Sequence, residues 1–165
     1  MRRLVALVVA FFALTGIAVA HDNGATVYCA KLAPVGVATT PTGEAVLIDG
    51  KNHNIAMIDA KGLTTGTSYP WHVHSFAPGV TDPCTAGAAQ GPIVSSFTFG
   101  VLTGNENGDG FAQAPSPSFD WGPATNQYYV NIHNPVTLAP IACGVLTRVA
   151  SKPHRWDTQR GFAVH

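Results

Sequence analysis

The sequence predicts an all-β fold in which about eight short antiparallel strands form a sandwich or a barrel. Apolar and polar residues alternate with a period of two in several segments; for example, Ile55, Met57 and Asp59 share one face. Turn-forming sequences separate these segments, and none has the periodicity of an amphipathic helix. The predicted strands are residues 25–32, 43–49, 54–60, 69–75, 93–102, 110–114, 127–133 and 141–149.

The turns between these strands are rich in Gly and Asn, which tolerate positive φ. Residues 49–52 (DGKN) separate the second and third predicted strands, and residues 107–110 (NGDG) lead into the sixth. The segment 105–110 also carries oxygen ligands of the kind that bind calcium. Because it lacks the ligand spacing and the terminal Glu of a calcium loop, we expect a hairpin turn there.

The first twenty residues have the features of a signal peptide. Arg2 and Arg3 precede an apolar run at 4–14, and small residues at 18–20 (AVA) form a cleavage signature. The run is short for a membrane span, and no second candidate follows it. We therefore expect an exported protein, periplasmic or extracellular, with no membrane segment after cleavage. The predicted organisation is a signal peptide at 1–20, one β domain at 21–150 and a polar C-terminal tail at 151–165.

The composition excludes two classes of protein. Cleavage would leave seven basic and nine acidic residues, a net charge of about −2 with His neutral, and no basic patch. Nucleic acid is therefore not an expected partner. Hydrophobic residues make up 46% of the chain, which argues against disorder.

Three cysteines predict one disulfide and one remaining thiol in an oxidising compartment. Three cysteines allow three different single disulfides. Cys29 lies in an apolar strand-like run and is expected to be a buried free thiol, whereas Cys84 lies in a Pro-rich loop. These positions favour a Cys84–Cys143 bond.

Three of the seven histidines lie where a metal site would need them. His72 and His74 are two residues apart in a predicted strand, so both side chains point to the same face. His133 ends another predicted strand and would complete a three-nitrogen site if the two strands are neighbours. Imidazole suits copper, zinc, iron and nickel, so the ligand set alone does not select the metal. A plain polar strand face is the alternative for an isolated His-x-His pair.

Four segments, in their order along the chain, resemble copper–zinc superoxide dismutase. They are residues 60–66 (AKGLTTG), residues 71–76 (WHVHSF), Cys84 and residues 141–146 (IACGVL). The resemblance covers roughly residues 25–149. It implies a Greek-key barrel of about eight strands, a copper ion bound by His72, His74 and His133, and a disulfide between the loop Cys and the Cys of the last strand.

Two departures from that family bear on activity. The family's zinc ligands and bridging His follow the loop Cys, but residues 85–132 contain no His. One copper ion and no zinc are therefore expected. Where the family has an Arg that guides superoxide, this chain has Pro140. Arg148 or Arg155 could substitute for it, although nothing in the sequence supports either.

The remaining histidines are less closely tied to the site. His21 would be the first residue of the mature chain, and its amine and imidazole could add a copper chelate of the histidine-brace kind. His154 lies in the tail, and His53 and His165 are expected to face solvent. Asn131 shares the strand face of His133 and is a candidate for orienting a ligand.

Three functions remain open at this point. The first is exported copper binding or buffering with weak or no dismutase activity, and the second is true copper-dependent dismutation of superoxide. Residues 91–94, 105–110 and 129–133 also resemble the chordin-type (CHRD) domain, which implies a third, non-catalytic interaction role. No general base or oxyanion group for a zinc hydrolase is apparent. The sequence does not identify a protein partner.

Overall fold

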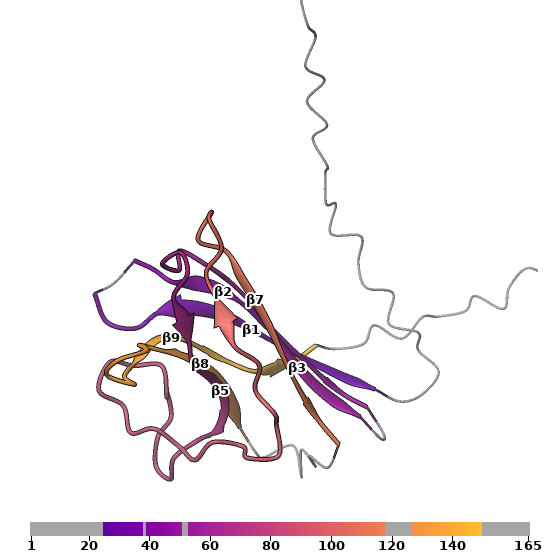
Figure 1. Cartoon of the computed structure of the whole chain (residues 1–165). Coiled ribbons are helices and arrows are strands. Elements are labelled where there is room, and N and C mark those ends of the chain that lie inside the picture. Colours follow the sequence, from indigo (N-terminus) through magenta and orange to yellow (C-terminus); the bar gives the residue numbers. More distant parts are fainter. Residues whose placement is uncertain (1–24, 38, 51–52, 118–126, 150–165) are drawn as a thin grey trace, which may run out of the picture.

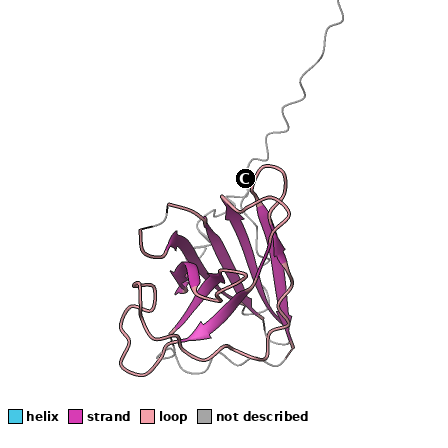
Figure 2. Ribbon diagram, turned by 60° about the vertical axis from the view of Figure 1, so that its left-hand side comes forward, coloured by secondary structure: helices cyan, strands magenta, loops and turns pink. Residues whose placement is uncertain are grey.

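The computed structural model describes residues 25–37, 39–50, 53–117 and 127–149, and all regular structure among them is β-strand (Figure 2). The predicted all-β fold is therefore confirmed. The strands are β1 (Thr26–Pro34), β2 (Thr42–Asp49), β3 (Asn54–Lys61), β4 (Ser68–Tyr69), β5 (Trp71–Ser75), β6 (Leu102–Thr103), β7 (Gly110–Ser116), β8 (Tyr128–His133), β9 (Pro140–Val145) and β10 (Thr147–Arg148).

Seven strands form one curled antiparallel sheet in the order β5-β8-β9-β1-β2-β3-β7. In Figure 1, β1, β2, β3 and β7 lie side by side as one half of the barrel, and β5, β8 and β9 form the other. β10 pairs with the start of β1, and β4 pairs with β6. The chain crosses from one half of the sheet to the other between β3 and β5 and again between β7 and β8, as in a Greek-key arrangement.

The inner face of this sheet forms the core, because alternate residues of each long strand point inward. On β5 the inward residues are Trp71 and Val73, which pair with Ile132 and Val130 of β8, and all four are almost fully buried. The indole of Trp71 donates a hydrogen bond to the Gly100 carbonyl at 2.8 Å, so its one polar group is satisfied inside the barrel. The residues next to these on β5, His72 and His74, consequently point to the outer face.

The strand predicted at residues 93–102 is wrong except at its last residue, Leu102 in β6. This segment crosses the opening between the two edge strands of the sheet. The Val94 amide bonds to the Val73 carbonyl of β5 at 2.9 Å, whereas the Gly100 amide bonds to the Gln113 carbonyl of β7 at 3.1 Å. Between the two contacts, the Phe97 amide bonds to the Val94 carbonyl and closes a turn. Because the segment changes partner within a few residues, it cannot form a continuous ladder with either strand.

The turn predicted at residues 105–110 is confirmed, but the flanking strands β6 and β7 pair with β4 and β3 and not with each other, so it does not close a hairpin. The Asn105 side-chain oxygen accepts hydrogen bonds from the amides of Asn107 and Asp109 at 2.8 and 3.0 Å, and Gly108 has a φ of 78°. Asn105 therefore satisfies the backbone of the turn, as Asn commonly does in such loops.

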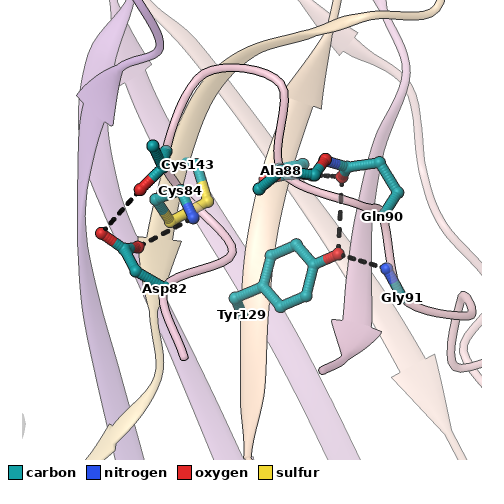
Figure 3. Close-up of a disulfide and its surroundings, with 9 residues drawn as sticks. Asp82, Cys84, Ala88, Gln90, Gly91, Tyr129 and Cys143 are labelled. Atoms are coloured by element: carbon teal, nitrogen blue, oxygen red, sulfur yellow. Dashed lines mark hydrogen bonds between the residues drawn. A yellow bond between two sulfur atoms is a disulfide. The ribbon is translucent and has the colours of Figure 1, made fainter. Parts of the chain in front are cut away.

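One disulfide joins Cys84 to Cys143 across 59 residues, which confirms the predicted pairing. It links the loop after β5 to the outer face of β9 (Figure 3). Cys29 is free, as predicted, but half-buried rather than buried, because strand alternation points its neighbour Ala30 into the core instead. A structural disulfide is typical of oxidising, non-cytoplasmic compartments.

Among the described residues, no helix has the length and apolar character to cross a bilayer.

Candidate metal centre

Two neighbouring strands bring the predicted histidines together on the outer face of the sheet. β5 pairs with β8, so that His72 lies opposite Asn131 and His74 opposite Tyr129. The His133 amide donates to the Pro70 carbonyl at 2.8 Å, which places this third histidine beside the start of β5. The ring centroids are 5.8 Å apart for His72 and His74, 5.1 Å for His72 and His133, and 5.6 Å for His74 and His133.

Three ring nitrogens in this cluster are buried and lack a hydrogen-bond partner: Nδ1 of His72, Nε2 of His74 and Nε2 of His133. The three histidines also offer ligand atoms that all lie within 4.8 Å of one another. Metal–nitrogen bonds of about 2.0–2.1 Å hold nitrogens within about 4 Å of one another, so small ring rotations suffice to bind one ion. Leaving buried polar atoms unpaired is unfavourable, and a metal ion would satisfy all three. The residues fit a metal site.

Backbone carbonyls set the orientation of two of these rings. Nδ1 of His74 lies 2.8 Å from the Gly91 carbonyl, and Nδ1 of His133 lies 3.0 Å from the Leu138 carbonyl. A carbonyl oxygen can only accept a hydrogen bond, so each Nδ1 carries the proton and donates. Each Nε2 is then left with its lone pair, which is the tautomer of an Nε2 metal ligand.

The carbonyl that fixes His133 belongs to a strained residue. Leu138 has a φ of 58°, and it is the one non-glycine residue with positive φ in the described part of the chain. The left-handed conformation costs a residue of this type roughly 1–2 kcal/mol. The turn is held by Asn134, whose side-chain oxygen accepts hydrogen bonds from the amides of Val136 and Thr137 at 2.9 and 3.0 Å. Strain of this kind is typical of functional sites, and here it accompanies a carbonyl aimed at a candidate ligand.

The site keeps its histidines neutral. Burial, with smaller contributions from the neighbouring His133 and His74, lowers the pKa of His72 to about 4. Burial also lowers the pKa of His74 and of His133, although their hydrogen bonds to Gly91 and Leu138 act in the opposite direction. Neutral imidazole is the form that binds metals, so an ion entering at pH 7 displaces no protons.

These pKa shifts predict that the metal-free protein loses stability in acid. Each histidine titrates near 6.5 when unfolded and lower when folded, so below pH 6.5 the unfolded chain binds more protons. The stabilising contribution is complete above about pH 6.5 and is lost as the pH falls toward 4. Denaturant unfolding in the presence of a chelator should show a lower free energy of unfolding at pH 4.5 than at pH 7.5. A His72→Gln variant should show a weaker pH dependence. A free energy that stays constant, or increases, on acidification would contradict the described environment.

Other residues singled out from the sequence lie elsewhere or act differently. His53 is exposed before β3, as predicted. His21, His154, His165 and Arg155 lie outside the described residues. The side-chain amide of Asn131 donates to Gln90 and to none of the histidines. Asn131 can therefore orient a ligand only indirectly, through the loop that carries Gln90.

The structure also shows where Pro140 and Arg148 lie, the two described residues that bear on the guidance of superoxide. Pro140 lies directly opposite His133 on β9. Arg148 pairs with Tyr28 in β10, beyond the other end of β9, and so does not replace the missing Arg at the site.

A cavity of about 290 Å³ opens beside His72, and none of the residues that line it is charged. Phe99 forms one wall, with its ring edge-on to His72 at 5.0 Å between centroids. The cavity is lined by Ser68, Tyr69, Pro70, Trp71, His72, Phe99, Gly100 and Val101.

Several residues that shape the site are not apparent in the sequence. Gly91 and Leu138 act through backbone carbonyls, which leave no signature in the residue type. Tyr129, whose ring stacks on His74 at 5.1 Å and 16°, could have been found, because it shares a strand face with Asn131 and His133.

No protein-family model matches this chain, and no curated protein matches it either. The geometry of the three histidines and of the groups that hold them is therefore the observation that indicates function.

Proposed function

We propose that this is an exported, superoxide-dismutase-like copper-binding protein in which His72, His74 and His133 hold a single copper ion, with weak or no dismutase activity. The observation that carries the proposal is the set of three buried, unpartnered imidazole nitrogens on one sheet face. A purely structural or interaction domain of the chordin type would leave these nitrogens without partners. The Cys84–Cys143 disulfide supports an oxidising compartment, in keeping with the expected signal peptide.

Copper is favoured over zinc on two grounds. A site made of imidazoles binds Cu²⁺ more tightly than Zn²⁺ in the usual order of divalent metals. In the part of the chain that the structure describes, His72, His74 and His133 are also the one group of three or more His, Cys, Asp or Glu residues that could hold an ion. This supports one metal rather than the copper–zinc pair of the family that the sequence resembles. Bound copper would supply one-electron redox chemistry.

The protein's own residues bind and orient the metal without providing for an anionic substrate. Gly91 and Leu138 fix the rings of His74 and His133, while Phe99 packs against His72. Rapid dismutation needs a cationic route that attracts superoxide. Pro140 is neutral, and the cavity beside His72 has no charged lining. These features support metal binding as the main function.

A dismutase assay of the copper-loaded mature protein tests this assignment. We expect a rate far below the diffusion limit, with little dependence on ionic strength and no increase on adding zinc. Copper in solution at the same concentration serves as the reference for adventitious activity. A near-diffusion-limited rate that falls steeply with salt would contradict the proposal, because it would require the anion guidance that these residues lack.

A further inference from the structure

A short segment of the loop after β5 lies against the strand that carries two of the candidate ligands. The Ser75 amide donates to the Pro92 carbonyl at 3.0 Å, and Ile93 forms an isolated antiparallel bridge with His74. Directly before these two residues in the loop, the Gly91 carbonyl accepts the hydrogen bond from Nδ1 of His74. The partner that sets the tautomer of His74 therefore lies 17 residues away in sequence.

This distance in sequence distinguishes His74 from His133. The carbonyl that fixes His133 lies five residues along the chain, within the same hairpin. The Gly91 carbonyl belongs to a long loop, so other groups must hold it in place. Gly91 itself approaches β5 so closely that a Cβ there would lie 1.7 Å from the Ser75 carbonyl oxygen. A glycine is thus required, and the glycine has no side chain of its own with which to fix its position.

Side chains from β8 supply the missing support (Figure 3). The Tyr129 hydroxyl accepts a hydrogen bond from the Gly91 amide at 2.8 Å and donates one to the Gln90 side-chain oxygen at 3.4 Å. The same oxygen of Gln90 accepts from the side-chain amide of Asn131. Tyr129 is fully buried, and its ring stacks on His74. One tyrosine thus contacts both the ligand ring and the loop that orients it.

We infer that Tyr129 and Gln90 are positioning residues of the metal centre, which hold the Gly91 carbonyl against His74 and so keep Nε2 of His74 facing the metal. The inference rests on the proposed metal-binding function. Without the Tyr129 hydroxyl, the Gly91 amide loses its acceptor inside the protein and the loop can move away from β5. Nδ1 of His74 then loses a fixed acceptor, and the His74 ring is free to rotate or to change tautomer.

The test compares Tyr129→Phe with Tyr128→Phe in the full mature chain, with copper(II) as the probe. Tyr129→Phe keeps the stacked ring and removes only the hydroxyl, while Tyr128→Phe removes a hydroxyl from the opposite face of the same strand. We expect Tyr129→Phe to lower the copper affinity about tenfold, the lower end of the range typical for groups that orient metal ligands. We also expect the electron paramagnetic resonance parameters of the bound copper to change. A loss of general stability alone would leave these parameters as they are in the wild type. Tyr128→Phe should match the wild type in both.

Wild-type affinity and an unaltered copper spectrum in Tyr129→Phe would overturn the inference while leaving the proposed function intact. Failure of the wild type to bind copper would instead overturn the proposed function. If Tyr129→Phe does not fold, Gln90→Ala replaces it in the comparison. Gln90 is exposed on the loop, so its substitution should not prevent folding. It should lower the affinity and change the spectrum in the same direction, and a wild-type result for Gln90→Ala would contradict the inference equally.

Discussion

Replacing His72, His74 or His133 by alanine is expected to lower the copper affinity at least tenfold in each case, which corresponds to about 1.4 kcal/mol of binding free energy. Each substitution removes one of the three buried nitrogens that lie without a partner on the outer sheet face. These nitrogens make no hydrogen bond themselves, but His74→Ala and His133→Ala also remove the bonds from Nδ1 to the Gly91 and Leu138 carbonyls. His72→Ala therefore gives the cleanest measure of the effect on metal binding. Competition titrations against a chromogenic copper chelator measure it directly.

His53→Ala is the matched control, because His53 is exposed and precedes β3, away from the cluster. Its affinity should equal that of the wild type. Equal losses in His53→Ala and His72→Ala would show that copper binds to surface imidazoles without selectivity. Such a result would remove the basis for a dedicated site.

The contribution of His21 can be separated from that of the other three histidines. It lies outside the described residues and would be the N-terminal residue after signal cleavage. Extending the mature chain by one residue blocks its amine as a ligand. We expect the copper affinity of the extended protein to be unchanged. If the extension abolishes binding, the centre is of the histidine-brace kind.

Removal of the disulfide in a Cys84→Ala, Cys143→Ala double variant is expected to lower the free energy of unfolding by about 4 kcal/mol. The bond closes a loop across 59 residues, and the chain-entropy model gives roughly this value for a loop of that length. The loop also carries Gln90 and Gly91 to the metal centre. Denaturant unfolding of metal-free protein isolates the effect on the fold.

Cys29→Ala serves as the control for the disulfide variant. Cys29 is free and half-buried, so its replacement should change the free energy of unfolding by much less. If the double variant and Cys29→Ala unfold with the same free energy as the wild type, the disulfide does not stabilise the domain.

The alternation of apolar and polar residues was sufficient to predict most of the strands. Asn54–Lys61 extends the predicted strand at 54–60 by one residue, and Thr42–Asp49 extends the one at 43–49 by one residue at its start. The segment 93–102 was mispredicted because its apolar content reflects contact with the core, where Phe97 is buried, and not membership of a strand. Hydrogen bonds to two different edge strands are a property of the closed fold that local sequence does not reveal.

The candidate site was predictable to the extent that it depends on strand periodicity. The i, i+2 spacing of His72 and His74 determines their common face, and the structure shows that face to be the outer one. The position of His133 beside them depends on the pairing of β5 with β8, which are far apart in sequence, and the family resemblance supplied this expectation. Gly91 and Leu138 act through carbonyl groups that every residue possesses. Their roles could not be predicted from residue type.

The most direct test of a three-histidine copper centre is metal analysis of the correctly processed mature protein, combined with electron paramagnetic resonance of the copper-loaded form. After equilibration with equal concentrations of copper and zinc, we expect about one copper per chain, negligible zinc and a signal that shows coordination by imidazole nitrogens. Equal amounts of copper and zinc would contradict the single-metal assignment. A protein that retains no copper, or whose copper signal lacks nitrogen ligands, would contradict the assignment of His72, His74 and His133 as the metal site.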